Sequence, residues 1–123
     1  MRFIPTKTHG ILDYLMGVLL IASPWIFGFA NNEAAQWVPI VIGILVIGQS
    51  LFTNYEVSLI QIIPMPFHLG MDVATGLFLA ASPWIFGFAD FVYWPHLIFG
   101  ILEVGAALTT HKVPDYVRHK EFA

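Results

Sequence analysis

The chain of 123 residues contains no cysteine, which excludes disulfide bonds and thiol redox chemistry. Charged residues are also scarce, at 11% of the sequence against roughly 25% in a typical soluble domain. The formal net charge of −3 gives no reason to expect nucleic-acid binding. Hydrophobic residues dominate at 58%, so the composition is that of a membrane protein.

Four long stretches of the chain are nearly free of charge. A transmembrane helix needs about 20 mainly apolar residues to cross about 30 Å of hydrocarbon. We therefore predict an all-α, polytopic membrane protein with four transmembrane helices, at residues 8–29, 36–54, 67–88 and 93–111. A soluble bundle would need a polar face on each helix, and Val38–Leu51 offers only Gln49 and Ser50.

The second half of the chain repeats the first. The segment Ala22–Ala30 recurs letter for letter at Ala81–Ala89, and such self-similarity determines the architecture. We predict a single membrane domain of two parallel two-helix repeats, residues 4–56 and 63–112, followed by a cytoplasmic tail at 113–123. Because each repeat crosses the membrane twice, the pseudo-twofold axis between the repeats lies along the membrane normal.

The distribution of basic and aromatic residues predicts the topology. All lysines and arginines lie near the two ends of the chain, so both termini face the cytoplasm by the positive-inside rule. The four tryptophans fall at the outer ends of the helices, where amphipathic rings prefer to lie, and we interpret His96 as an interfacial side chain there. We expect a multi-pass protein of a prokaryotic cytoplasmic membrane. The bases are Arg2, Lys7, Lys112, Arg118 and Lys120.

Each repeat carries a Ser-Pro-Trp motif near the outer end of its first helix. Proline within a helix removes one hydrogen bond and produces a kink, and a serine hydroxyl can bond to the carbonyl left free. Tryptophan then anchors the bent segment at the interface, and a following glycine permits close approach or helix termination. We interpret the motif as architectural; the alternative is that it lines an outward-facing vestibule. Its residues are Ser23, Pro24, Trp25, Gly28, Ser82, Pro83, Trp84 and Gly87.

Two copies of Ser-Pro-Trp, each in the first helix of a two-helix unit, resemble the SPW-repeat family of small integral membrane proteins. The resemblance extends from Ile4 to about Thr110 and rests above all on the repeated nonapeptide. It implies a four-span, membrane-bound repeat protein, and it implies no catalytic residues.

Ionisable side chains within the predicted spans form a candidate polar seam. Such residues are rare in membranes, usually face the bundle interior and often mark functional sites. A histidine and an aspartate four residues apart share one helix face in each repeat, and the fourth helix adds a glutamate without a counterpart. We expect the seam to lie along the bundle axis. It consists of His9, Asp13, His68, Asp72, Glu103 and His111.

Three interpretations of the polar seam are open. In the first, each aspartate accepts a hydrogen bond from its own histidine one turn away, or from a backbone amide, and these pairs fix helix packing. In the second, the seam conducts protons or cations, as chains of acids and histidines do in pumps. In the third, His9 and His68 hold a metal ion or a haem, since imidazole is a common ligand and bundle cores host cofactors.

The first interpretation is preferred. It predicts a non-enzymatic helical bundle, without catalytic residues or a cofactor, that acts by self-association or as an accessory to a larger membrane complex. Glycine-rich helix faces favour such association. The expected partners are the lipid bilayer and either a second copy of the chain or a membrane-complex partner. Proton or cation conduction is the first alternative function, and a haem- or metal-binding bundle is the second.

Overall fold

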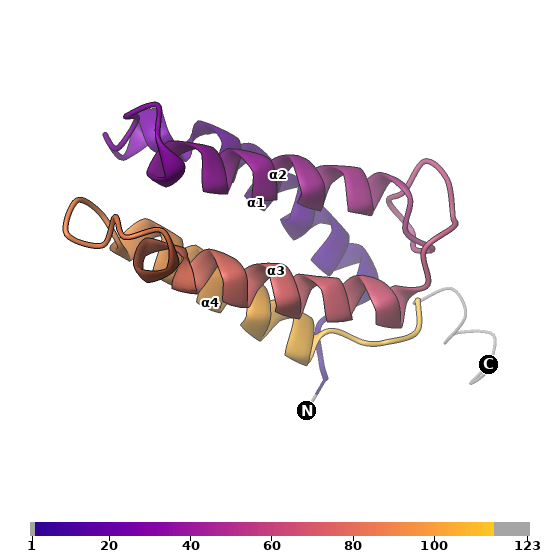
Figure 1. Ribbon diagram of the computed structural model, residues 1–123. Coiled ribbons are helices and arrows are strands. Elements are labelled where there is room, and N and C mark those ends of the chain that lie inside the picture. Colours follow the sequence, from indigo (N-terminus) through magenta and orange to yellow (C-terminus); the bar gives the residue numbers. More distant parts are fainter. Residues whose placement is uncertain (1, 115–123) are drawn as a thin grey trace, which may run out of the picture.

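The computed structural model describes residues 2–114, which form four helices joined by turns (Figure 1). Within these residues the regular secondary structure is all-helical, as predicted, with two isolated β-bridges beside it. Residues 115–123 of the predicted tail, with Arg118 and Lys120, lie outside the described part. The helices are α1 (Thr6–Ile26), α2 (Ala34–Leu51), α3 (Met65–Ile85) and α4 (Trp94–Thr109).

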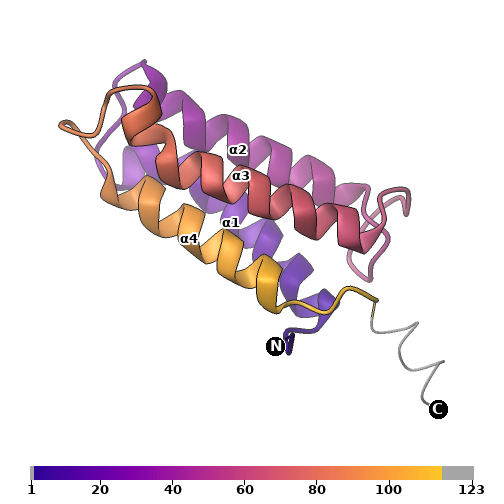
Figure 2. The same ribbon diagram turned by 60° about the horizontal axis from the view of Figure 1, so that its bottom comes forward.

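The helices pack as two pairs, one from each repeat (Figures 1 and 2). α1 packs against α2 and α3 against α4, and the pairs meet where α2 packs against α3, whereas α1 and α4 make little contact. The N-terminal segment, the α2–α3 linker and the end of α4 lie at one end of the bundle, called the linker end (residues 2–5, 52–64 and 110–114). The connections at residues 27–33 and 86–93 form the opposite, turn end.

Glycines allow the two helices of each pair to approach closely. Gly17 on α1 faces Gly43 on α2, and a methyl group built on Gly43 would lie 2.6 Å from the carbonyl oxygen of Gly17. Gly76 and Gly100 make the equivalent contact between α3 and α4. Backbones can approach this closely only where side chains are absent, which is a common packing mode of membrane helices.

The Ser-Pro-Trp motif forms the last turn of α1 and of α3. Pro24 has no N–H for the carbonyl of Leu20, and the Ser23 hydroxyl donates to that oxygen instead, at 2.7 Å. Gly28 then adopts a left-handed conformation with φ of 74°, and the Phe29 amide donates to the Pro24 carbonyl at 2.8 Å. The same arrangement recurs at Ser82, Pro83 and Gly87.

These glycines end the two helices earlier than the sequence pattern predicts. The predicted ends are residues 29 and 88, whereas α1 ends at Ile26 and α3 ends at Ile85. Left-handed backbone conformations are readily accessible to glycine and interrupt the helical hydrogen bonding. Trp25 and Trp84 are exposed on these last turns, so the motif places aromatic rings around the turn end.

Backbone pairing at the linker end crosses between the repeats. Ile4, which precedes α1, forms a bridge with Thr110, which follows α4. Ile63, which precedes α3, forms the equivalent bridge with Thr53, which follows α2. We call these two bridges the clasp. The clasp brings a threonine of each repeat toward the first helix of the other.

Apolar side chains occupy the interior between the polar seam and the turn end: Leu20, Ile42, Val46, Leu79 and Phe99. On the outside, many large apolar side chains are exposed, as on α1 at Leu15 and Val18. Among the described residues, α1 and α2 are long and apolar enough to cross a membrane, and α4 is apolar but shorter.

Candidate functional site

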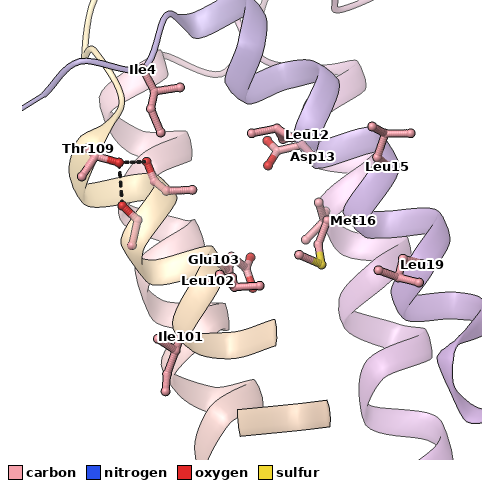
Figure 3. Close-up of a pocket in the computed structure, with 13 residues that line it drawn as sticks. Ile4, Leu12, Asp13, Leu15, Met16, Leu19, Ile101, Leu102, Glu103 and Thr109 are labelled. Atoms are coloured by element: carbon pink, nitrogen blue, oxygen red, sulfur yellow. Dashed lines mark hydrogen bonds between the residues drawn. The ribbon is translucent and has the colours of Figure 1, made fainter. Parts of the chain in front are cut away.

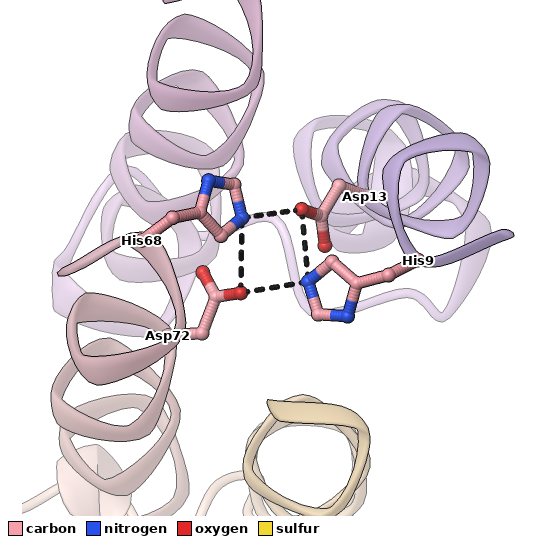
Figure 4. Close-up of side chains that lie close together, drawn as sticks. All are labelled: His9, Asp13, His68 and Asp72. Atoms are coloured by element: carbon pink, nitrogen blue, oxygen red, sulfur yellow. Dashed lines mark hydrogen bonds and ion pairs between the residues drawn. The ribbon is translucent and has the colours of Figure 1, made fainter. Parts of the chain in front are cut away.

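Two histidines and two aspartates, one pair from α1 and one from α3, form a closed ring between the repeats (Figure 4). Nε2 of His9 lies 3.1 Å from Oδ2 of Asp13 on its own helix and 2.9 Å from Oδ2 of Asp72 on the other. Nε2 of His68 lies 2.7 Å from Oδ2 of Asp13 and 3.1 Å from Oδ2 of Asp72. We call these four buried residues the His–Asp quartet.

Helix periodicity and the repeat explain why the quartet forms. Residues four apart lie on the same helix face, so each histidine is directed toward the aspartate one turn along. The sequence predicts this pairing within each helix. The structure adds a second pairing between the helices, and it is the shorter one for both histidines, His9 with Asp72 and His68 with Asp13. The quartet therefore joins the two repeats as well as the turns of each helix.

A threonine of the clasp contacts the far side of each histidine ring. Oγ1 of Thr110 lies 2.8 Å from Nδ1 of His9, and Oγ1 of Thr53 lies 2.6 Å from Nδ1 of His68. Each threonine hydroxyl donates its one hydrogen to the backbone carbonyl four residues earlier, at 2.6 Å. Its oxygen must then accept from the histidine. Nδ1 of both rings therefore carries a hydrogen, and Nε2 of both rings faces the carboxylates.

The two aspartates have different further partners. The Ser50 hydroxyl donates to Oδ2 of Asp13 at 3.2 Å, and the Gln49 amide donates to Oδ1 of Asp72 at 2.9 Å. The residue that corresponds to Gln49 in the second repeat is Ala106, which has no polar group to offer. In agreement, the Asp13 side chain is 10% exposed and that of Asp72 is 1% exposed.

The α2–α3 linker covers the quartet at the linker end. Tyr55 is fully buried there, with its ring centroid 5.5 Å from that of His68, and Gly10 leaves the space that the tyrosine ring occupies. Burial raises the pKa of the Tyr55 hydroxyl, so this group stays neutral. The Thr6 hydroxyl donates to the Glu56 carboxylate at 2.7 Å, which holds the linker on α1. The quartet is thus closed off from this end.

The other two residues of the polar seam lie outside the quartet. Glu103 is buried on α4, where its Oε1 accepts a hydrogen bond from the Thr75 hydroxyl at 2.8 Å. Its Oε2 is buried and has no hydrogen-bond partner within residues 2–114. His111 is half-buried after α4, and its backbone amide donates to the Ile4 carbonyl at 3.0 Å as part of the clasp.

The Ser-Pro-Trp residues lie far from the quartet. Ser23 and Ser82 are ten residues beyond Asp13 and Asp72, which corresponds to about 15 Å of helix. Their hydroxyls donate to backbone carbonyls of their own helices. The motif therefore shapes the turn end and does not contribute to the quartet.

His96 is buried, and its interpretation as an interfacial side chain is wrong. Its ring lies between Phe29 and Phe88, with centroids 4.9 Å from each, and its Nε2 lies 2.8 Å from the carbonyl oxygen of Ala35. The two Ser-Pro-Trp turns fold their phenylalanines over it, which the sequence pattern does not reveal.

Sequence reasoning missed the threonines that orient the histidines. Thr53 and Thr110 occupy equivalent positions in the two repeats, as the histidines and aspartates do. The presence of threonine at both equivalent positions was therefore a signal that could have indicated a shared role. Threonine at a helix end has many ordinary explanations, however, and its distance from the histidines depends on how the repeats dock.

The fold and the site define a class: an all-helical repeat bundle whose two halves meet at a buried His–Asp ring. More specifically, the chain belongs to the SPW repeat domain family, whose model matches residues 7–110. This membership points to a small membrane protein, and two of the described helices are long and apolar enough to cross a bilayer. No curated protein and no solved structure shows a significant match to the chain.

Proposed function

We propose that this protein is a small membrane metalloprotein whose His–Asp quartet binds one divalent first-row metal ion between the two repeats. The observation that carries the proposal is the pair of threonine contacts at Nδ1 of His9 and His68. Metal-binding histidines almost always donate their second ring N–H to an oxygen acceptor, commonly a carboxylate, a backbone carbonyl or water, which fixes the tautomer and the ring orientation. In this protein a threonine hydroxyl oxygen takes that place beside each ring. Here the partners direct both Nε2 atoms to the centre of the quartet, where an ion would replace the hydrogens that Nε2 shares with the aspartates.

The ligand set suits a four-coordinate ion. One potential ligand atom from each quartet residue lies within 4.8 Å of all the others. Zn²⁺ binds imidazole nitrogen and carboxylate oxygen at about 2.0–2.2 Å in a tetrahedron, which separates the ligand atoms by about 3.3 Å. Small side-chain movements would bring the quartet to this geometry.

Charge also favours a divalent ion at this place. Two carboxylates and two neutral imidazoles carry two negative charges, which one divalent cation offsets. A buried site needs this balance because uncompensated charge in a low-dielectric interior is costly. The adjacent donors, Ser50 and Gln49, hold the carboxylates in place from outside the ring.

The role that this site supports is structural. Four protein ligands would complete a tetrahedron and leave no open position for a substrate, as in structural zinc sites. This supports the expectation of a non-enzymatic bundle, in which the ion joins the repeats. The exposed apolar side chains of the joined bundle would contact lipid, a second copy or a membrane-complex partner.

Haem and ion conduction fit the described structure less well. Oδ2 of Asp13 and of Asp72 lie between the two imidazoles, where a porphyrin between axial His9 and His68 would need space. For conduction, an apolar cluster that includes Leu20, Leu79 and Phe99 lies between the quartet and the turn end. A single metal ion needs neither the space of a porphyrin nor a polar path to the turn end.

Zinc binding to the purified, untagged protein tests the proposal. Protein in nanodiscs is dialysed against a chelator and then titrated with Zn²⁺ by isothermal calorimetry. We expect one site per chain in the unmodified protein. Asp72→Asn removes a ligand at nearly constant volume and should weaken binding beyond the roughly 10–100-fold typical of losing an outer partner.

Two variants serve as controls for this titration. Glu103→Gln and His111→Ala change residues of the polar seam outside the quartet and should leave the stoichiometry and affinity intact. Absence of Zn²⁺ binding in the unmodified protein would contradict the proposal. The quartet would then be held together by hydrogens on both Nε2 atoms, as in the first interpretation.

We also propose that all four helices span the membrane with the linker end in the cytoplasm. Arg2, Lys7 and Lys112 lie at or beside the linker end, which supports this orientation by the positive-inside rule. The absence of cysteine provides a clean background for labelling. In intact cells an impermeant maleimide should label Asp90→Cys at the turn end, and it should label Val113→Cys only after permeabilisation. The reverse pattern would contradict the orientation.

A further inference from the structure

Two equivalent crevices flank the quartet, one beside each aspartate. One lies between α1 and α4, encloses about 580 Å³ and is called the α1/α4 crevice (Figure 3). Its counterpart between α3 and α2 encloses about 470 Å³. Asp13 lines the first and Asp72 lines the second, as the repeat requires. Differences between the crevices therefore show where the two repeats have diverged.

The α1/α4 crevice is the more open of the two toward its aspartate. In the α2/α3 crevice the Gln49 side chain covers Asp72 and also donates to the His68 carbonyl at 3.3 Å. Ala106 takes the position of Gln49 in the α1/α4 crevice and leaves Asp13 partly exposed there. α1 and α4 also make little contact, while α2 packs against α3.

The α1/α4 crevice also contains a carboxyl group with an unused oxygen. Glu103 stands where the first repeat has Val46, and it lines the crevice with Asp13. Glu103 is buried, with 7% of the residue exposed, and Thr75 satisfies only Oε1. Oε2 has no partner within the described residues. Figure 3 shows Glu103 and Asp13 entering the crevice from opposite helices.

We propose that the α1/α4 crevice binds a long-chain alkylammonium ion. The ammonium group lies between Glu103 and Asp13, and the aliphatic chain lies along the apolar wall. An ammonium group has three N–H donors and one positive charge, which match an unused carboxylate oxygen on one side and a partly exposed carboxylate on the other. The volume is within the range of about 300–1,000 Å³ that small-molecule sites occupy. The wall consists mainly of Leu12, Leu15, Met16, Leu19, Ile101 and Leu102.

The proposed ammonium site and the proposed metal site have different sets of residues, apart from Asp13. Within the described residues the hydrogen bond of the Glu103 side chain goes to Thr75 on α3 and not to the quartet, and Asp72 does not line the α1/α4 crevice. Only Asp13 belongs to both. Each site can therefore be weakened by a substitution that leaves the other site intact.

Decylamine is the probe, and decanol, with the same chain and no charge, is its matched control. Protein in phosphatidylcholine nanodiscs is incubated with each probe and examined by native mass spectrometry, with empty nanodiscs as the blank. We expect one decylamine per chain, not displaced by excess decanol. Glu103→Gln should weaken decylamine binding by about tenfold or more, as expected for the loss of one charge-assisted hydrogen bond.

A second variant blocks the crevice without removing a carboxylate. Ala106→Gln introduces the side chain that already covers Asp72 in the other repeat, and it should reduce decylamine binding to a similar extent. Asp72→Asn should weaken Zn²⁺ binding and leave decylamine binding unchanged, whereas Glu103→Gln should weaken decylamine binding and leave Zn²⁺ binding unchanged. This pair of results distinguishes failure of the ammonium site from failure of the metal site.

Three outcomes would overturn the ammonium site. Equal binding of decanol and decylamine would show a crevice that recognises only apolar chains. Unchanged decylamine binding in folded Glu103→Gln and Ala106→Gln variants would place the amine elsewhere. A phospholipid retained by the protein and not displaced by decylamine, but lost in Ala106→Gln, would identify a lipid as the occupant.

Discussion

Thr53 and Thr110 illustrate how one side chain can set the chemistry of its neighbour. Each threonine hydrogen is used by a backbone carbonyl, so the oxygen accepts from the histidine and fixes its tautomer. The histidine then presents Nε2 to the centre of the quartet. An alanine in place of either threonine would remove the oxygen that accepts from Nδ1, so the histidine would lose the contact that fixes its tautomer.

Replacing the orienting threonines should weaken metal binding without removing a ligand. Thr53→Val and Thr110→Val keep the side-chain shape and delete the hydroxyl, and we expect each to lower Zn²⁺ affinity by about 10–100-fold. Thr109→Val is the control, since the Thr109 hydroxyl donates to the Gly105 carbonyl and makes no contact with the quartet. Titration calorimetry measures the change. Equal affinity in all three variants would show that the threonines do not orient metal ligands.

Ser23 and Pro24 form a second pair in which one residue compensates for the other. The serine hydroxyl bonds to the Leu20 carbonyl that proline leaves without a partner. Ser23→Ala should therefore lower the free energy of unfolding by about 1–3 kcal/mol, the typical cost of an unsatisfied buried group.

The double-mutant cycle with Pro24→Ala isolates this compensation. With alanine at position 24 a backbone amide is available for the Leu20 carbonyl, so the serine substitution should cost much less in that background. Unfolding in mixed detergent, followed by circular dichroism, gives the four stabilities. The same cost in both backgrounds would mean that the hydroxyl has another role.

The helices pair closely because glycines face one another at equivalent places in both repeats. A methyl group on Gly43 meets the Gly17 backbone, whereas at Gly48 and Gly105 nothing lies within 4 Å. Gly43→Ala and Gly100→Ala should each destabilise the bundle by about 1–3 kcal/mol through overpacking. Gly48→Ala and Gly105→Ala should be neutral or stabilising, because alanine favours the helix by about 0.5–1 kcal/mol. Thermal unfolding compares the four; similar effects at all four positions would contradict the packing account.

Much of the helical arrangement could be predicted from the sequence, because it depends on local patterns. Apolar length and the repeat predict four helices, and the observed helices differ from the predicted ones mainly at their ends. The i, i+4 spacing also predicts that His9 and Asp13 share a face, as do His68 and Asp72. Helix ends are harder because they depend on single residues, such as Gly28, whose conformation is not visible in the pattern.

The cross-repeat contacts could not be predicted, because they depend on how the two helix pairs dock. The sequence places Glu103 in the same seam as the histidines, yet the structure gives it a separate partner, Thr75. The sequence also gives no sign that the Thr110 hydroxyl would contact the ring of His9, which lies 101 positions earlier in the chain. A different docking of the two helix pairs would change these partners while leaving every local pattern intact.

Seen as a whole, the molecule is two similar hairpins that contact each other at both ends, with paired backbone segments at the linker end. In the clasp, a backbone segment of each repeat pairs with a segment of the other. In the quartet, the histidine of each repeat contacts the aspartate of the other, so both kinds of contact join the repeats at the linker end. The turn end lacks such an exchange of paired segments within the described residues. A metal ion in the quartet would add a bond between the repeats where the backbone already joins them.

X-ray absorption at the zinc edge of the Zn²⁺-loaded protein in nanodiscs tests this account most directly. The account predicts four ligands at about 2.0–2.2 Å, two of them imidazole nitrogens with the outer-shell scattering that imidazole rings give, and two carboxylate oxygens. It also predicts the loss of this spectrum in Asp72→Asn. A shell of oxygen alone, or a single imidazole unaffected by Asp72→Asn, would show that the ion is bound elsewhere and that the quartet is not a metal site.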